Sequence, residues 1–325
     1  MLQIKFDKWI KIRIGEPITA FDVDSNMIIF GSISGYIGQY LYNQNELRYI
    51  PDVLEEIIRG VTIEQQDRVY IVVGDVYGYI FDYQMRGSHQ WKFERTHSPP
   101  LCSSTLSLCY KTKALLLSVA PTQNKDIGVD ISTKKNSLYL FDLQTQENNT
   151  FYVDMPLLQV PFDFKGDQLL MLEYLKEAKK KLSILYLNNQ PQVNILLDID
   201  PKIEYISHGR FTQNGILFVE NHKIVKIYNP LDKQSKVIKI TKQQIVALDY
   251  HDNEITLLEY DGTVTCLENE NQKVHFNILK VVQIPQELVK HKYLFDMGYP
   301  YYIKKREKRI VISHDLGLLS FTLLM

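Results

Sequence analysis

The sequence predicts an all-β fold in which residues 1–325 form one domain, with seven units of four antiparallel strands closed into a ring. Three observations predict it. Short apolar strands recur along the whole chain, several neighbouring strands meet at a glycine turn, and the spacing of these turns closes on itself across the two termini.

The hairpins are the clearest signal. Four of them have Gly at the turn: IIFGSISGYIGQY (28–40), YIVVGDVYGYIFDY, ITLLEYDGTVTCL and IVISHDLGLLSFT. Glycine adopts the positive φ that a tight turn between antiparallel strands requires. We therefore expect a hairpin at the centre of each unit.

The position of the turn recurs along the chain. It falls at Gly35, Gly78, Asn136, Leu182, Lys223, Gly262 and Gly317. Successive positions are 39 to 58 residues apart, and 43 residues lead from Gly317 past the C-terminus to Gly35. Seven units therefore use the whole chain.

Each hairpin is flanked by further apolar strands. The clearest first strands are ITAFDVD at Ile18, STLSLCY at Ser104, QIVALDY at Gln244 and YLFDMGY at Tyr293. The clearest fourth strands are QWKFERT at Gln90, TFYVDM at Thr150, VNILLDI at Val193 and VHFNIL at Val274. Four strands in roughly 40 residues are typical of a β-propeller blade.

The two ends of the chain complement each other. The last unit, about 280–325, ends without a fourth strand, whereas residues 8–14 alternate like a strand and have no unit of their own. We therefore predict a single seven-bladed β-propeller whose N-terminal strand completes the last blade. A two-domain β protein with irregular repeats is the alternative.

The hairpins resemble those of the WD-repeat family, whose blades end in Gly-x-Ile-x-x-Trp-Asp. The matching residues are Gly35, Ile37 and Tyr40; Gly78, Ile80 and Tyr83; Leu138, Phe141 and Asp142; Val225, Tyr228 and Asn229; Gly262, Val264 and Leu267. Tryptophan is missing from its position, Glu268 replaces an aspartate, and the family's Gly-His dipeptide is absent. The resemblance thus implies a divergent propeller without the family's Asp-His network, of the kind found in cytoskeletal, ciliary and membrane-trafficking assemblies.

Composition narrows the functional classes. The chain has 37 basic and 38 acidic side chains, so no overall field attracts nucleic acid or an acidic membrane. Three cysteines, an odd number, argue against a disulfide framework and for a reducing compartment. No apolar stretch approaches a membrane span. We expect a cytoplasmic protein, of cytoskeletal or ciliary location; a basic N-terminal transit peptide is the alternative.

The familiar catalytic motifs are missing. No phosphate-binding loop, nucleophile elbow, His-Glu-x-x-His helix or paired Cys-x-x-Cys occurs. Ser313, His314 and Asp315 are consecutive, so their side chains alternate between faces and suit a turn better than a triad. His97, Cys102 and Cys109 lack a fourth ligand for zinc. We expect no cofactor, no metal and no catalytic residue.

Two interrupted hairpins are candidate docking loops. The segment 121–136 and EYLKEAKKK in the next unit are long and polar, and loops on rigid scaffolds commonly carry function. In a WD-type ring they would project from one face of neighbouring blades. The candidate partner-binding residues there are Asp126, Asp130, Lys134, Lys179 and Lys180.

The second candidate is the basic run KKREKR, residues 304–309, which we expect to form a loop between the first and second strands of the last unit. Its candidate residues are Lys304, Lys305, Arg306, Lys308 and Arg309. The run suits an acidic protein surface, and a plain solvated loop is the alternative. Few aromatic residues flank it, which argues against nucleic acid.

Together these observations predict a non-catalytic protein-interaction scaffold, a subunit of a larger intracellular complex. A peptide-motif or substrate-receptor propeller is one alternative. A metal-dependent propeller enzyme with a site in the central channel is the other.

Overall fold

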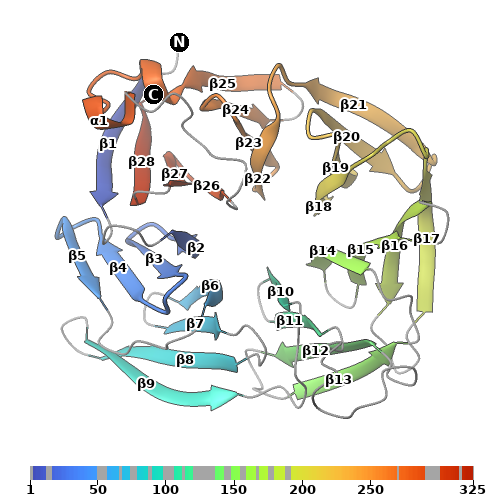
Figure 1. Ribbon diagram of the computed structural model, residues 1–325, viewed down its shortest axis with the longest axis horizontal. Coiled ribbons are helices and arrows are strands. Elements are labelled where there is room, and N and C mark those ends of the chain that lie inside the picture. The colour runs from blue at the N-terminus through green and yellow to red at the C-terminus, as the bar shows by residue number, and fades with distance from the viewer. Residues whose placement is uncertain are drawn as a thin grey trace. The chain divides into compact units, whose positions relative to one another are not determined.

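The computed structural model consists almost entirely of antiparallel β-sheet (Figure 1). It describes residues 3–11, 17–49, 57–65, 68–73, 79–86, 90–97, 106–111, 114–119, 136–142, 148–153, 159–165, 168–174, 179–186, 192–268, 271–289, 301–314 and 317–324. Within these residues the strands form seven sheets of four strands each.

The first three sheets follow chain order. One contains β2 (Ile18–Val23), β3 (Met27–Ser32), β4 (Ile37–Leu41) and β5 (Glu46–Tyr49). The next contains β6 (Ile58–Gln65), β7 (Arg68–Val73), β8 (Tyr79–Arg86) and β9 (Gln90–His97). The third contains β10 (Leu106–Lys111), β11 (Ala114–Val119), β12 (Asn136–Asp142) and β13 (Asn148–Val153).

Three further sheets repeat this order. The fourth sheet contains β14 (Gln159–Lys165), β15 (Gln168–Tyr174), β16 (Lys180–Tyr186) and β17 (Gln192–Ile199). The fifth contains β18 (Ile206–Thr212), β19 (Gly215–Glu220), β20 (Ile224–Asn229) and β21 (Gln234–Ile240). The sixth contains β22 (Ile245–His251), β23 (Glu254–Glu259), β24 (Thr263–Glu268) and β25 (Asn271–Asn277). A 3₁₀ turn (Ile278–Lys280) and the short helix α1 (Gln286–Val289) follow β25.

The last sheet joins the two ends of the chain. Its strand order is β1 (Gln3–Lys11), β28 (Gly317–Leu324), β27 (Arg309–His314) and β26 (Ile303–Arg306). The N-terminal strand pairs antiparallel with the C-terminal one, from Gln3 opposite Leu324 to Lys11 opposite Gly317. The predicted N-terminal strand, 8–14, overlaps β1 at residues 8–11, and residues 12–14 lie outside the described residues. The strand begins earlier than predicted, at Gln3, and its buried Phe6 stacks edge-on against Phe321.

The hairpins lie where the sequence predicted them. The seven turn positions fall within two residues of the start of the third strand of their sheets. Gly35 and Gly262 have φ of 83° and 82°, so the predicted need for glycine is confirmed at these two turns. The first strand expected at Tyr293 lies outside the described residues, and β26 is the described first strand of the last sheet.

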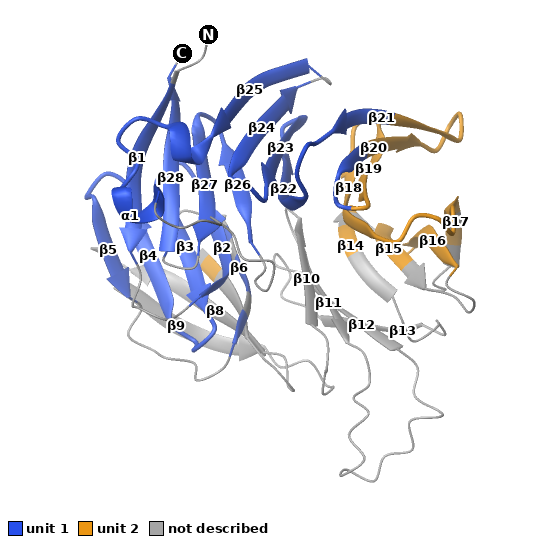
Figure 2. Cartoon of the chain, turned by 45° about the horizontal axis from the view of Figure 1, so that its top comes forward, with its two compact units in different colours: residues 1–66, 222–225, 237–325 blue, residues 67–221, 226–236 orange. Residues whose placement is uncertain are grey.

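The chain divides into two compact units (Figure 2). Unit 1 comprises residues 1–66, 222–225 and 237–325, and unit 2 comprises residues 67–221 and 226–236. Unit 1 has two apolar clusters, one around Leu258, Ile312 and Phe321 and one around Ile28 and Phe30. Unit 2 has a cluster around Leu172, Leu182 and Phe218. Apolar residues of neighbouring sheets thus make up the core, as regular strand alternation predicts.

Candidate functional site

The basic run 304–309 is a β-hairpin, which corrects the expected loop. Residues 303–306 form β26, Glu307 has a φ of 50° at the turn, and Arg309 begins β27 opposite Arg306. Burial alternates along β26, with Ile303 and Lys305 buried and Lys304 and Arg306 half-buried. The run forms a strand because carboxylates of neighbouring first and second strands neutralise its cations.

Lys304 is paired with Asp22 of β2. Its Nζ lies 2.6 Å from Asp22 Oδ1, and Asp22 Oδ2 accepts the backbone N–H of Ile63 at 3.0 Å. Burial acts to raise the pKa of this carboxyl, but the Lys304 charge and the Ile63 hydrogen bond outweigh it and lower the pKa below the ordinary 3.8. Asp22 therefore stays ionised and connects three strands, β26, β2 and β6.

Arg306 is paired with Asp249 of β22. The Arg306 guanidinium donates to Asp249 Oδ2 at 2.8 Å, and the backbone N–H of Lys305 donates to the same oxygen at 2.9 Å. Both side chains are mostly buried, with exposed fractions of 22% and 14%. The carboxylate of β22 thus holds both the backbone and a side chain of β26.

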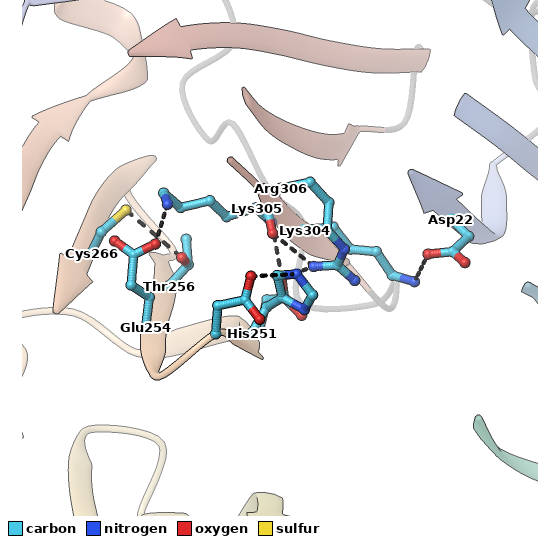
Figure 3. A network of polar contacts seen from close by, with 10 residues as sticks. Asp22, His251, Glu254, Thr256, Cys266, Lys304, Lys305 and Arg306 are labelled. Carbon is cyan, nitrogen blue, oxygen red and sulfur yellow. Dashed lines mark hydrogen bonds and ion pairs between the residues drawn. The ribbon is translucent and has the colours of Figure 1, made fainter. Parts of the chain in front are cut away.

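Lys305 extends away from Lys304, into the contact with β23 (Figure 3). Its ammonium bonds the carboxylate of Glu254. Nearby, Thr256 donates to Cys266 Sγ at 3.7 Å, and burial raises the pKa of the Cys266 thiol to about 11. This thiol is therefore protonated at neutral pH and packs as a small apolar group, without the thiolate that a nucleophile needs.

His251 lies at the edge of the same network, beside Arg306 (Figure 3). Partial burial and the Arg306 charge lower the pKa of His251 below 6.5, although Asp252, at 3.2 Å from Nε2, acts in the opposite direction. The imidazole is therefore neutral at pH 7. Because Lys304, Lys305 and Arg306 each bond a carboxylate, the cluster holds β26 to first and second strands of the adjacent sheets.

The aspartates of this cluster belong to a repeated contact. An aspartate near the end of a first strand accepts a backbone N–H of the next sheet's first strand in three places. The pairs are Asp22 with Ile63, Asp163 with Phe211 at 2.7 Å, and Asp249 with Lys305. Each of these three first strands also contains a shift in pairing register, between Ile18 and Ala20, between Pro161 and Asp163, and between Ile245 and Ala247. The three aspartates thus tie one first strand to the next.

Sequence reasoning missed these aspartates, although a signal was present. They occur in Phe-Asp-Val (21–23), Phe-Asp-Phe (162–164) and Leu-Asp-Tyr (248–250), inside strands that were themselves predicted in two of three cases. A carboxylate between apolar strand residues is costly unless a partner is near. That cost could have indicated a buried acceptor; its partner could not be read from the sequence.

The other predicted docking residues have different surroundings. Asp126, Asp130 and Lys134 lie outside the described residues, so the expected docking surface stays a prediction. Lys179 is exposed at the start of β16. Lys180 donates to the backbone carbonyls of Ile203 and Glu204, at 2.7 and 2.5 Å, and so supports its own chain.

The last two cations of the basic run differ from the first three. Lys308 is exposed at the turn. The guanidinium of Arg309 lies over the ring of Tyr42, 3.3 Å from its centroid, and donates to the Ser25 carbonyl at 3.4 Å. Within the basic run, Lys308 is thus exposed to solvent, whereas Lys304, Lys305 and Arg306 bond carboxylates of the same chain.

The rejected triad also has a local role. Ser313 Oγ accepts the Tyr302 N–H at 2.8 Å, His314 is buried at the end of β27, and Asp315 lies outside the described residues. Within the described part of the chain, no three His, Cys, Asp or Glu side chains gather as metal ligands would. Among the same residues, no helix is long and apolar enough to cross a membrane.

Comparison with known proteins identifies the fold. No family model and no curated protein matches the sequence. Among solved structures, the WD40 β-propeller domain of Doa1 superposes with a TM-score of 0.62 at 9% identity, over 98% of this chain and 97% of that one. A chain of the mitotic checkpoint complex gives 0.62 at 9% identity, covering 100% and 93%. The computationally designed Ika8 protein gives 0.61 at 12% identity, covering 98% and 99%.

These likenesses, together with the repeated four-stranded sheets, define the class: the chain has an all-β fold of the WD40 β-propeller kind. The predicted resemblance to WD-repeat propellers is confirmed at the level of the fold. At these identities the likeness extends to fold alone.

Proposed function

We propose that the chain is a non-catalytic protein–protein interaction scaffold, a structural subunit of a larger intracellular assembly of cytoskeletal, ciliary or membrane-trafficking type. In this proposal the sheets form a single-domain, seven-bladed ring that β1 closes. The place of β1 beside β28 supports the closure, since it ties the first strand of the chain to the last.

The observation that carries the proposal is the use made of the charged first strands. Lys304, Lys305 and Arg306 bond Asp22, Glu254 and Asp249, and two of these carboxylates also hold backbone N–H groups of the next sheet. Groups that could serve acid–base chemistry are thus engaged in stiffening the sheets against one another. A stiffened array of this kind suits a support for partners bound at the surface.

Two further observations agree with the proposal. One neighbour in fold is a chain of the mitotic checkpoint complex. Cys266 is a free, buried thiol, in keeping with a reducing compartment. The peptide-motif reader is the second candidate, and the exposed outer strand β21, described in the next subsection, favours it.

Purification from native cells tests the proposal. The tagged full chain should co-elute on size exclusion with other proteins in a constant molar ratio, measured by quantitative mass spectrometry. A folded variant in which residues 122–136 are replaced by a short Asn-Gly turn should lose partners that dock on that loop. Recovery of wild-type protein alone, at its 38.1 kDa monomer mass, would overturn the scaffold function.

A further inference from the structure

The second half of β21, Val237–Ile240, exposes apolar residues that the outer strands β25 and β1 bury. None of the seven β21 side chains is buried, and Val237 and Ile240 are 47% and 65% exposed. By contrast, the outer strand β25 buries Val274, and β1 buries Phe6 and Ile10. An outer strand with exposed β-branched residues is a surface that another strand can cover.

The backbone of β21 is open along the same edge. It is the last strand in the order β18-β19-β20-β21, so β20 pairs with one of its sides only. In an antiparallel pair, alternate residues direct their N–H and C=O groups away from the partner strand. A row of donors and acceptors on the far side of β21 therefore remains for an added strand.

The charge of this edge is positive. Residues 237–242 contain Lys239 and Lys242 and no acidic residue, and Lys223 lies beside them, its carbonyl accepting the Thr241 N–H at 3.0 Å. Lys239 donates to the neutral amide of Gln272 at 3.0 Å. Within the described residues, no carboxylate contacts Lys223, Lys239 or Lys242, in contrast to the paired cations of β26.

We propose that this edge of β21, formed by Val237–Ile240 with Lys223, Lys239 and Lys242, binds an extended acidic segment of a partner protein as a fifth strand. Backbone hydrogen bonds hold the segment. Its acidic side chains lie on the face of β21 that carries Lys239, and its apolar side chains lie on the opposite face, beside the exposed Ile240. The inference rests on the proposed interaction function and adds to it a site and the chemistry of the partner.

The lysines decide between an acidic partner and a second copy of this chain. Two β21 edges pairing with each other would place Lys239 and Lys242 near their own copies, and like charges across a strand pair are destabilising. Lysine on an open edge prevents self-association for this reason. An acidic strand carries the opposite charge at the same positions. The β21 edge therefore favours an acidic strand over a second copy of itself.

A synthetic peptide tests the proposal on the full chain. The probe is a fluorescent peptide that alternates Asp or Glu with Val or Ile, titrated by anisotropy at low and high salt. Lys239→Glu combined with Lys242→Glu should weaken binding by about tenfold or more, because each attraction becomes a repulsion. A peptide with Lys in place of the acidic residues should bind this double variant better than it binds wild type.

The matched control is Lys273→Glu combined with Lys280→Glu, which makes the same change in net charge on and next to β25. Lys273 already bonds Glu268 at 3.1 Å, and Val274 of that strand is buried. The control should change peptide affinity by no more than about twofold. Equal loss in both double variants would show attraction by net charge only and would overturn the proposal. Unfolding midpoints of all variants confirm that they are folded.

The backbone part of the proposal has its own readout. Bound peptide should slow amide hydrogen exchange at alternate residues of Val237–Ile240, and a peptide N-methylated at alternate residues, with unchanged side chains, should lose binding. Undiminished binding of the N-methylated peptide, absence of binding at low salt, a dimer by light scattering, or preferential binding of single-stranded DNA would each overturn it.

The two proposals fail separately. If native partners co-purify equally with wild type and with the Lys239→Glu, Lys242→Glu variant, and the peptide does not bind, the scaffold function stands and the β21 site is wrong. If wild type purifies alone while the peptide binds β21, the β21 binding site is supported and the proposed role in an assembly is wrong.

Discussion

Two lysine-rich strands of unit 1, β26 and the second half of β21, look alike in sequence and differ in structure. In β26, each of Lys304, Lys305 and Arg306 bonds a carboxylate of the same chain. In β21, Lys239 donates to a neutral amide and contacts no carboxylate among the described residues, and Val237 and Ile240 are exposed. The first strand joins sheets, whereas the second leaves its edge and its charge open to solvent.

The difference shows that a run of cations in the sequence does not by itself indicate a binding surface. Its role depends on whether carboxylates of the same chain lie beside it. Asp22 lies 282 residues from Lys304 in the sequence, and Asp249 lies 57 residues from Arg306. Only the packing of first strand against first strand brings them together. A buried cation beside such a carboxylate makes the fold depend on that carboxylate, while an exposed cation without one is available to a partner.

Removal of Asp249 is expected to have the largest effect on stability. Asp249→Ala leaves the mostly buried Arg306 guanidinium and the Lys305 N–H without their shared acceptor. Breaking a buried pair in this way costs about 3 kcal/mol of the free energy of unfolding. Urea denaturation followed by circular dichroism measures the loss.

Asp198→Ala is the control for that experiment. Asp198 is 79% exposed and pairs with Lys181 at 3.5 Å on the outer strand β17. An exposed pair of this kind contributes less than about 0.5 kcal/mol. Equal losses in the two variants would contradict the division between charges that join sheets and charges on the surface.

Sequence reasoning recovered the fold further than the site, for a physical reason. Strand alternation and the positive φ of Gly35 and Gly262 are local properties, so the hairpins could be placed from the sequence. The pairing of β1 with β28 could be anticipated because the last unit lacked a strand. The hairpins and the pairing of the two terminal strands therefore both follow from the pattern of strands and turns in the sequence.

The candidate site depends on contacts between sheets, which no local pattern encodes. The run 304–309 was expected to be a loop because it lies between the strand predicted at Tyr293 and the hairpin IVISHDLGLLSFT. Its strand conformation requires Glu254 and Asp249, whose positions relative to β26 come from packing. The basic run was therefore visible in the sequence, and its partners were not.

A double-mutant cycle on Lys305 and Glu254 sharpens the comparison within β26 itself. Lys305→Met leaves the largely buried Glu254 carboxylate unpaired and should cost about 1 to 2 kcal/mol. Adding Glu254→Gln removes the orphaned charge and should restore part of that loss. Urea midpoints of the four proteins give the coupling energy; simple additivity of the two single changes would show that the pair contributes nothing.

The ion pair between Asp22 and Lys304 predicts a dependence of stability on pH. The pKa of Asp22 is lowered below 3.8 in the folded state, so its contribution is present above about pH 3.8 and is lost as pH falls through the folded value. Lys304→Met removes the main cause of the lowering. The variant should lose about 1 kcal/mol at pH 7 and begin acid unfolding at higher pH.

Acid titration followed by circular dichroism measures this shift. Lys308→Met serves as the matched control, because Lys308 is an exposed lysine of the same run at the turn after β26. It should leave the acid midpoint unchanged. A midpoint that moves equally in both variants would assign the effect to net charge and not to the bond with Asp22.

The smallest effect is expected at the open edge, where Lys242→Ala should change the free energy of unfolding by less than about 0.5 kcal/mol. Lys242 is exposed, and no carboxylate among the described residues contacts it. Loss of this lysine removes weak repulsion from Lys223 and Lys239. Thermal and urea unfolding should therefore superimpose on wild type, while affinity for the acidic peptide falls. A stability loss comparable to that of Lys305→Met would mean that β21, like β26, uses its cations inside the fold, and the contrast between the two strands would disappear.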